Sequence, residues 1–417
     1  MTRCELLAPA GNLNKLKLAF YYGADAVYVG GKNFSLRTFA DNFTDEELAE
    51  GIAFAHARGK KVYVAVNIFA RNADFAQLPD YFRTLERLGA DAVLVSDLGV
   101  FRACRKAAPS LPLHISTQAN TTNSQSAAMW KELGASRVVL ARELSLEEIA
   151  KIREENPDLE LEAFVHGAMC ISYSGRCLLS DYLDGRSSNR GACVQACRYR
   201  YEIRTQECRN DGWTEVQEDE RGTYFLNSKD LNMSAHLSEL ETAGVCSFKI
   251  EGRMKSEYYL ATVVNAYRRI LDGGDLQLLK EELSCAAHRD YTTAYMLGEN
   301  GKTVSYDNSQ TKGTCEFIAV VRGYEGPKSG AESGFGDGSE DSDGRCGRVY
   351  AEMRTRFYEG DVLEILSPSD AFGKQITVTH MKDSTGAPCT DAKRVQEIVS
   401  FDCPYALHEG DILRRRR

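Results

Sequence analysis

Short apolar runs alternate with amphipathic segments of helical length over residues 1–255. Most of the runs are rich in Val, Ile, Leu or Tyr, which is typical of parallel strands buried on both faces. The predicted strands are 5–8, 26–29, 62–67, 92–96, 113–117, 137–141, 159–165 and 247–251, and helices are expected over 14–22, 44–58, 78–88 and 146–154. Thr44 precedes Glu47, and Ser145 precedes Glu148, at the spacing of a capping box, so two of these helices are predicted to begin there.

A seven-residue pattern marks the same unit three times. GADAVYV at 23–29 recurs as GADAVLV at 89–95 and, more loosely, as GASRVVL at 134–140. Each copy places a glycine that ends a helix directly before a strand. Eight strands alternating with helices predict an α/β fold of the TIM-like (β/α)8 barrel type, and an open doubly wound sheet is the alternative. No Gly-x-Gly-x-x-Gly follows the first strand, which argues against the dinucleotide-binding form of that alternative.

Two domains are expected in the chain. The barrel is assigned to residues 1–300, with an insertion at about 167–244 between its last two strands. Residues 301–417 show short strands separated by turns, at 315–321, 348–353, 362–366, 375–380, 397–401 and 412–414, and this pattern predicts a small C-terminal β-barrel. A Gly/Ser/Asp-rich stretch at about 323–347 is predicted to be a loop. The basic tail 414–417 is explained equally well by solubility and by contact with RNA.

The charge balance limits what the chain can bind. It has 417 residues with 51 Lys and Arg against 60 Asp and Glu, a formal net charge of −9. This excludes a protein that coats nucleic acid by bulk charge, although a local basic groove stays possible. The N-terminus lacks the basic start and apolar stretch of a signal peptide, and no apolar run approaches the roughly 20 residues of a membrane span. We therefore expect a cytoplasmic protein with no membrane partner.

The cysteines carry the strongest chemical signal. Four of the 13, namely Cys170, Cys177, Cys193 and Cys197, fall within 28 residues of the insertion and follow the spacing C-x6-C-x15-C-x3-C. Four thiolates can close a zinc site or hold an iron–sulfur cluster. The six-residue gap after Cys170 departs from the short knuckles of structural zinc sites, so the spacing favours a cluster, with zinc and no metal as alternatives.

The stretch around these cysteines also resembles a known family. Residues 162–170, EAFVHGAMC, and 174–180, SGRCLLS, are similar to the signature of a collagenase-like peptidase family of undefined catalytic type, which includes prephenate-dependent RNA hydroxylases. LLAPAGN at 6–12 and SFKIEGRMKS at 247–256 extend the match over most of the chain. The chain is most similar to the branch that hydroxylates the wobble uridine of tRNA.

The resemblance implies a set of cofactors and partners. It implies a [4Fe-4S] cluster on Cys170, Cys177, Cys193 and Cys197, with Cys208 as the replacement if Cys197 is not a ligand. It further implies prephenate as co-substrate or ligand, the tRNA anticodon loop as substrate, and an electron-transfer partner. The activity expected from it is hydroxylation of the wobble uridine to 5-hydroxyuridine.

Polar residues at the ends of the predicted strands are the other site candidates, because barrel enzymes place their chemistry at that rim. His166, Lys249 and Glu251 are the catalytic candidates, the first as a proton donor or substrate contact and the other two in an ion-paired set with Arg253 at the mouth. Guanidinium groups suit the two carboxylates of prephenate, and amides and a tyrosine suit a nucleotide base. The substrate-binding candidates are Arg37, Asn67, Gln118, Arg142, Tyr173, Arg176 and Arg253.

Each candidate also has a purely structural explanation. A histidine at a strand end is often a hydrogen-bonded core residue, the charged trio can be a solvated strand edge, and Gln118 can cap a loop. We expect RNA to enter where basic residues flank the cysteines and the last strand, namely at Arg190, Arg198, Arg200, Arg204, Arg253 and Lys255.

Three other functions are alternatives to hydroxylation of tRNA. A collagenase-like peptidase would need an activated nucleophile, and neither Gly-x-Ser-x-Gly nor His-Glu-x-x-His occurs in the chain. A ribosomal RNA cytidine hydroxylase belongs to the long version of the family, for whose extra domains this chain is too short. The third is a cluster-containing RNA-binding protein without catalysis.

Overall fold

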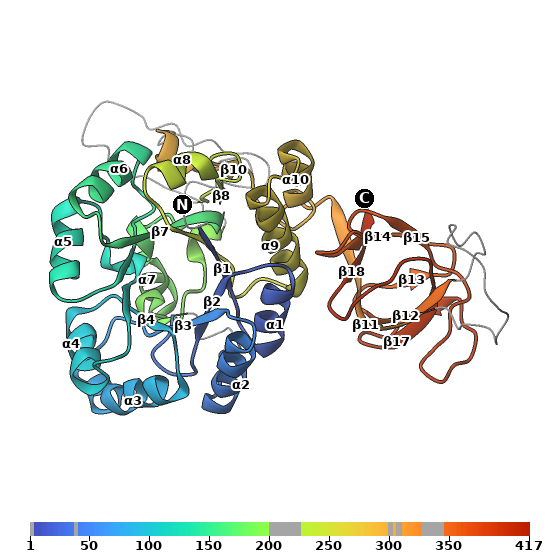
Figure 1. Ribbon diagram of the computed structural model, residues 1–417, viewed down its shortest axis with the longest axis horizontal. Coiled ribbons are helices and arrows are strands. Elements are labelled where there is room, and N and C mark those ends of the chain that lie inside the picture. Colours follow the sequence, from blue (N-terminus) through green and yellow to red (C-terminus); the bar gives the residue numbers. More distant parts are fainter. Residues whose placement is uncertain (1–3, 37–40, 200–226, 299–302, 306–310, 327–345) are drawn as a thin grey trace, which may run out of the picture. The chain divides into compact units, whose positions relative to one another are not determined.

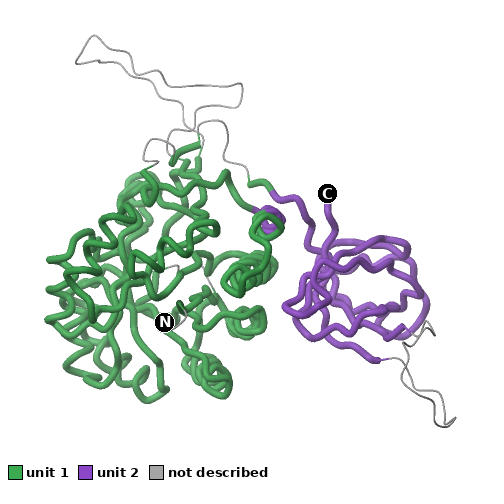
Figure 2. Tube along the Cα trace, turned by 45° about the horizontal axis from the view of Figure 1, so that its top comes forward, with its two compact units in different colours: residues 1–280, 288–312 green, residues 281–287, 313–417 purple. Residues whose placement is uncertain are grey.

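The computed structural model describes residues 4–36, 41–199, 227–298, 303–305, 311–326 and 346–417. The chain divides into two compact units (Figure 2). Unit 1 contains residues 1–280 and 288–312, and unit 2 contains residues 281–287 and 313–417. Most of the loop predicted at 323–347 lies outside the described residues, as does Arg37.

Unit 1 is a closed parallel barrel (Figure 1). Phe248 of the last strand pairs with Leu6 of the first strand and with Ala163 of the seventh, so the sheet has no open edge at this seam. This confirms the predicted (β/α)8 barrel and excludes the open doubly wound sheet. The barrel strands are β1 (Glu5–Pro9), β2 (Ala26–Gly30), β3 (Lys61–Ala65), β4 (Ala92–Val95), β5 (Leu113–Ile115), β6 (Arg137–Val139), β7 (Glu160–Ala168) and β9 (Ser247–Ile250).

Helices cover the outside of the barrel and begin where the capping signals predict (Figure 1). Thr44 and Ser145 both form complete capping boxes with their glutamates, which confirms two predicted helix starts. The helices are α1 (Leu13–Tyr21), α2 (Asp45–His56), α3 (Leu78–Leu88), α4 (Leu98–Ala107), α5 (Ser124–Glu132), α6 (Leu146–Glu155), α7 (Leu179–Asp184), α8 (Leu237–Thr242), α9 (Glu257–Leu271) and α10 (Leu276–Leu283). None of these described helices combines the length and the apolar character that a bilayer span requires.

The repeated Gly-Ala-Asp pattern has a physical explanation. Gly23 and Gly89 end their helices with φ of 102° and 81°, a left-handed conformation that favours glycine. The aspartate two residues later accepts a hydrogen bond from the neighbouring strand, at 3.0 Å from Leu6 N to Asp25 and 2.7 Å from Val62 N to Asp91. The pattern therefore stops the helix and fixes the start of the adjacent strand.

The insertion after β7 contains structure that the apolar pattern did not predict. The short strand β8 (Asp230–Asn232) pairs antiparallel with the end of β7 and parallel with β10 (Tyr291–Thr292). Three residues are too few to produce a readable alternation. Helix α8 then restores the barrel pattern before β9.

Unit 2 is an antiparallel sheet wrapped around its own core. Its strands lie close to their predicted positions: β11 (Cys315–Glu325), β12 (Gly347–Met353), β13 (Phe357–Tyr358), β14 (Val362–Leu366), β15 (Gln375–Thr377), β16 (Asp391–Ala392), β17 (Ile398–Cys403) and β18 (Ile412–Arg416). The main sheet runs in the order β15-β14-β18-β11-β12-β17. Lys382 and Ser400 exchange backbone hydrogen bonds of 2.8 and 2.9 Å, so the chain that follows β15 also bonds to β17 and closes the sheet. Phe357, Ile365 and Phe401 are fully buried inside it.

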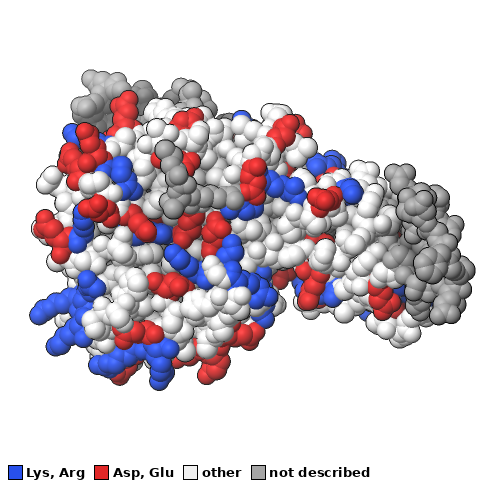
Figure 3. All heavy atoms as spheres, viewed as in Figure 1, with Lys and Arg blue, Asp and Glu red and all other residues white. Residues whose placement is uncertain are grey.

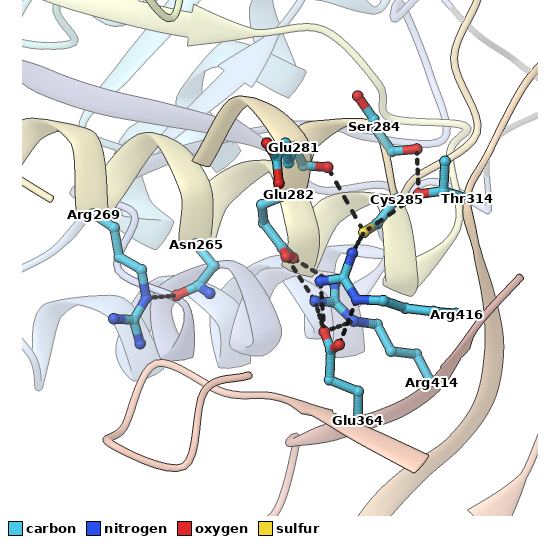
Figure 4. A network of polar contacts seen from close by, with 10 residues as sticks. All are labelled: Asn265, Arg269, Glu281, Glu282, Ser284, Cys285, Thr314, Glu364, Arg414 and Arg416. Atoms are coloured by element: carbon cyan, nitrogen blue, oxygen red, sulfur yellow. Dashed lines mark hydrogen bonds and ion pairs between the residues drawn. The ribbon is translucent and has the colours of Figure 1, made fainter. Parts of the chain in front are cut away.

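The basic C-terminal tail is part of this sheet. Arg414 is fully buried in β18, and its guanidinium donates to Glu282 at 2.6 Å and to Glu364 at 2.9 Å (Figure 4). Arg415 bonds to Glu316 and Asp361, both at 3.0 Å. The first two arginines of the tail are therefore ion-paired, and Arg414 is buried. These ion pairs explain the basic character of the tail at Arg414 and Arg415, and neither solubility nor RNA contact is needed.

Arg414→Ala is expected to lower the free energy of unfolding by about 3–5 kcal/mol, because it leaves the buried Glu282 carboxylate without its cation and removes one of the two cations of Glu364, which keeps Arg416. Urea titration followed by circular dichroism measures this change. Arg417→Ala is the matched control, since Arg417 is exposed and its nitrogen lies 3.7 Å from Glu316, and it should change stability little. Equal effects of the two substitutions would contradict the structural role of Arg414.

Candidate functional site

A cavity of about 420 Å³ lies at the carboxyl ends of the barrel strands, where barrel enzymes carry their sites. Strand ends form one side of it, and the cysteine-bearing segment after β7 forms the other. Ten of the predicted site residues line it together: Asn67, Gln118, Arg142, Cys170, Cys177, Cys193, Cys197, Lys249, Glu251 and Arg253. His166, Tyr173 and Arg176 are not among its lining residues.

The four clustered cysteines share this cavity. Backbone N–H groups of Leu179 and Gln195 donate to the sulfurs of Cys177 and Cys193, at 3.3 and 3.4 Å. Burial raises the pKa of the Cys197 thiol, and the proximity of Cys170, Cys177 and Cys193 adds to that rise. In the described part of the chain, no three metal-binding side chains converge as they would on a single ion. The chemistry of the donor set, four thiols that line one cavity with backbone N–H donors at two of the sulfurs, is compatible with an iron–sulfur cluster. Cys208 lies outside the described residues.

Arginines of the cysteine segment hold it against the barrel. Arg176 Nε donates to the Gln118 carbonyl at 2.9 Å, and Arg190 forms an ion pair with Asp74 at 2.8 Å. Arg198 donates to the Met169 carbonyl at 2.7 Å. Arg190 and Arg198, which we expected at an RNA entrance, therefore make internal contacts, and Arg200 and Arg204 lie outside the described residues.

A carboxylate that the sequence analysis missed fixes the loop between the first two cysteines. Glu143, just after β6, accepts hydrogen bonds from the backbone N–H and the hydroxyl of Ser174, at 2.6 and 2.7 Å. Ser174 is fully buried with φ of 43°, so these bonds hold a strained residue in place. Asn120 Nδ2 donates to the Tyr173 carbonyl at 3.2 Å. Only the position of Glu143 directly after Arg142 at a strand end could have indicated this role.

Exposed basic side chains gather elsewhere on the surface. Figure 3 shows them over α3 and α4. The exposed basic residues of these two helices are Arg83, Arg87, Arg102, Arg105 and Lys106.

We expected Lys249 at the mouth of the barrel, but its side chain lies deeper inside the barrel. Its Nζ is 2.6 Å from Glu162 and 4.4 Å from the centre of the Tyr28 ring. β9 ends at Ile250 and the chain turns at Gly252 with φ of 147°, so Lys249, Glu251 and Arg253 do not share one strand face. The predicted ion-paired trio is therefore wrong: the partner of Lys249 is Glu162.

Glu162 anchors a buried ionic network inside the barrel. Burial by itself would raise its pKa, but Lys249 and Arg137 hold the pKa at about 2. Arg137 lies 3.1 Å from Glu162 and 2.6 Å from Glu5, so the network joins four strands. The Glu162 side chain is completely buried, and the two cations compensate its charge.

Arg253 is engaged with the loop after β2. Its Nη1 donates to Ser35 Oγ at 2.9 Å and its Nη2 donates to the Leu36 carbonyl. A Cβ atom at Gly30 would lie 2.0 Å from Nη1, so only glycine leaves room for the guanidinium there. Arg253 lines the cavity, and its guanidinium also positions this loop.

His166 lies behind the barrel wall. The pairing of β7 with β9 shifts by one residue between Phe164 and His166, and this bulge turns the imidazole toward α9. Its Nδ1 is 3.3 Å from Tyr267 Oη, and burial lowers the pKa to about 3, so the ring is neutral at physiological pH. The structure thus places His166 outside the cavity. The prediction from its position at a strand end is wrong because no local sequence pattern indicates a bulge.

Three residues that line the cavity have a buried polar atom with no hydrogen-bond partner within the described residues. These atoms are Gln118 Oε1, Arg142 Nε and Arg289 Nε. Arg142 Nη1 donates to the Ala168 carbonyl at 3.2 Å, and Arg289 Nη2 is paired with Asp230 at 2.6 Å. Asn67, in contrast, is satisfied by Ser116 and Leu36 at 3.2 and 3.3 Å. Because a buried polar atom without a partner is costly, Gln118 and Arg142 indicate a place for a polar ligand.

The protein is thus a (β/α)8 barrel with a four-cysteine cavity, followed by a separate β unit. The chain belongs to peptidase family U32: that family matches residues 11–306, and the peptidase family U32 C-terminal domain matches residues 336–414. This confirms the family expected from the signature.

The curated relatives carry names from RNA hydroxylation. "tRNA hydroxylation protein P1" of Bacillus subtilis is 38% identical, over 99% of this chain and 94% of the relative. "tRNA hydroxylation protein P" of Escherichia coli is 36% identical, over 93% of this chain and 90% of the relative. "23S rRNA 5-hydroxycytidine C2501 synthase" of Escherichia coli is 37% identical, over 65% of this chain and 39% of the relative.

Lys249→Met is expected to lower the free energy of unfolding by about 3–5 kcal/mol at pH 7, because it removes one cation from a buried carboxylate. In the wild-type protein, Glu162 has a pKa depressed from 4.5 to about 2, so its contribution is complete above pH 4.5 and is lost as the pH falls toward 2. The substitution raises the pKa of Glu162, so the loss of stability between pH 4.5 and pH 2 should become smaller. Melting temperatures measured across a pH series, with the surface variant Lys17→Met as control, test both effects. Superimposable acid profiles would contradict the pairing.

Proposed function

We propose that this protein hydroxylates the wobble uridine of tRNA to 5-hydroxyuridine, with prephenate as co-substrate or ligand and a [4Fe-4S] cluster as cofactor. The observation that carries the proposal is the convergence of four cysteines and three polar side chains with an unsatisfied buried atom, Gln118, Arg142 and Arg289, in one cavity. The names of the full-length relatives supply the substrate class.

Cys170, Cys177, Cys193 and Cys197 would hold the cluster. When bound, such a cluster supplies redox chemistry in the cavity, and an electron-transfer partner would then be required. The backbone N–H groups of Leu179 and Gln195 would stabilise the thiolates of Cys177 and Cys193. Glu143 would keep the loop between Cys170 and Cys177 in its strained conformation.

Arg142 and Gln118 would bind prephenate. A dianionic ligand needs cationic hydrogen-bond donors, and the Arg142 guanidinium has a buried nitrogen without a partner within the described residues. Glu251 and Arg253 line the same cavity, while Lys249 has its charge compensated by Glu162. Substrate binding therefore depends more on Arg142 than on Lys249.

Neither peptidase nor ribosomal RNA chemistry finds equal support. Within the described residues, no serine or cysteine that lines the cavity is hydrogen-bonded to a histidine, and His166 faces away from it. The ribosomal RNA relative is matched over 39% of its length, against 94% for the tRNA hydroxylation relative. The full-length match favours tRNA as the substrate.

Anaerobic purification and assay test the proposal directly. The protein should contain iron and sulfide and should add one oxygen atom to uridine in undermodified tRNA when prephenate is supplied, as read by nucleoside mass spectrometry. A colourless protein without iron would contradict the cofactor assignment. Unchanged uridine would contradict the substrate assignment.

Cys170→Ala is expected to abolish most bound iron and the hydroxylation activity, since a [4Fe-4S] cluster needs its thiolate ligands. Cys346→Ala is the control, because Cys346 is an exposed cysteine of unit 2. Iron and sulfide analysis of the two anaerobic preparations makes the comparison. Full iron content in Cys170→Ala would show that Cys170 is not a ligand.

Arg142→Lys should raise the KM for prephenate by roughly tenfold or more with a smaller change in kcat, because lysine keeps the charge but loses the planar donor pair. Steady-state kinetics at varied prephenate, with Arg105→Lys on the outside of α4 as control, measures the split. A change in kcat alone would assign Arg142 to another step.

A further inference from the structure

The segment that carries the cysteines exposes an unusual set of rings. Tyr173, Tyr182 and Tyr199 have exposed fractions of 53%, 87% and 46%. Among the described residues of unit 1, these are all the tyrosines in the set of exposed large apolar side chains, and they fall within 27 residues of each other in sequence. We call these three residues the tyrosine rim. Exposed rings that gather in one segment of the chain are typical of a surface that contacts a partner.

The tyrosine rim borders the cavity. Ser174 and Gly175, next to Tyr173, line the cavity, as do Leu179 and Ser180, which begin the helix that presents Tyr182. Met254, at the start of the turn before α9, lines the cavity and is itself 46% exposed. A nucleotide whose base enters the cavity would therefore have neighbours within reach of the rim.

The backbone beneath the rim is held in place. Asn120 bonds to the Tyr173 carbonyl, and Glu143 bonds twice to Ser174. Farther along, Asn189 bonds to both the N–H and the carbonyl of Cys177 at 3.2 and 2.9 Å, just before α7. Exposed rings on a fixed backbone lose little conformational freedom when a ligand stacks on them.

We propose that the tyrosine rim stacks the unpaired nucleotides that flank the target base of the RNA substrate. The inference rests on the proposed function and adds to it the surface that presents the base. Every base offers an aromatic face, and unpaired loop nucleotides are recognised mainly by such stacking. The same segment carries charged residues of both signs, Arg176, Asp181, Asp184 and Arg186, and two exposed leucines, Leu178 and Leu183. A protein contact would use the leucines as well as the rings, and it is one outcome of the test below.

The mixed charge also predicts how this contact depends on salt. Asp181 and Asp184 lie on the same short helix as Tyr182, so phosphate attraction contributes little at this position. Stacking energy is largely insensitive to ionic strength, in contrast to phosphate contacts. The part of the affinity that the rim supplies should therefore persist as salt is raised.

The test compares ring removal with ring retention in the full-length, anaerobically prepared protein. Affinity for a fluorescent anticodon stem-loop RNA is measured by anisotropy for the wild-type protein, Tyr173→Ala, Tyr182→Ala, Tyr173→Phe and Tyr182→Phe, with Met129→Ala on the outside of α5 as the control. Each alanine variant should weaken binding about fivefold or more, and each phenylalanine variant should bind within about twofold of wild type, because stacking needs the ring and not the hydroxyl. The fold loss should be the same at low and high salt.

Distinct outcomes separate the rim from the proposed function. A wild-type protein that binds and hydroxylates tRNA, with alanine variants of unchanged affinity, would overturn the rim alone. Alanine variants that keep RNA affinity but lose self-association or response to a protein reductant would assign the rim to a protein contact and overturn the proposal. A wild-type protein that neither binds nor modifies tRNA would overturn the proposed function together with the rim. Equal iron content in all variants shows that the cavity is intact.

Discussion

The buried ion pair between Glu162 and Lys249 is the interaction on which the arrangement of unit 1 depends. It crosses the seam where β7 meets β9, and Arg137 and Glu5 extend it to β6 and β1. A charge in this interior is tolerable only when its partners are in place, so the network disfavours other registers at the seam. With the seam closed, eight strand ends surround one cavity, and the polar groups that follow them meet there.

The segment with four cysteines depends in turn on that rim. Arg176 and Arg190 bond to groups of the barrel, Arg198 bonds to Met169 directly after β7, and Glu143 holds the strained Ser174. These bonds explain how the described part of the insertion, which carries only short helices around the cysteines, presents its thiols at defined places. They also explain why basic residues lie near the cysteines of a chain with net charge −9. Most of these residues make contacts that stabilise the site.

Charge alone is therefore a poor guide to how such a protein meets RNA. The exposed basic side chains visible in Figure 3 lie over α3 and α4, and the tail arginines Arg414 and Arg415 are paired within unit 2. Within the described residues, the cavity has unsatisfied polar atoms on Gln118, Arg142 and Arg289, and the neighbouring segment exposes the rings of Tyr173 and Tyr182. Recognition built from such groups is selective for shape and stacking.

The sequence by itself determined the barrel, the strands of unit 2, the two capping boxes and the cysteines of the cavity. Local sequence patterns indicate these features. The patterns are apolar periodicity, Ser or Thr with Glu three residues later, and the spacing of the cysteines. Gln118 and Arg142 were also found in this way, because a polar residue at a strand end has one place to go in a closed barrel.

Only the tertiary structure decided which partner each charged or ring side chain meets. Lys249 bonds to a residue 87 positions away, His166 is turned outward by a bulge, and Arg414 is buried by Glu282 and Glu364 from distant segments. Such pairings depend on strand register and on chain closure, and no local pattern encodes either of them. The fold follows from short-range periodicity, whereas the chemistry of the site follows from contacts that exist only once the barrel has closed.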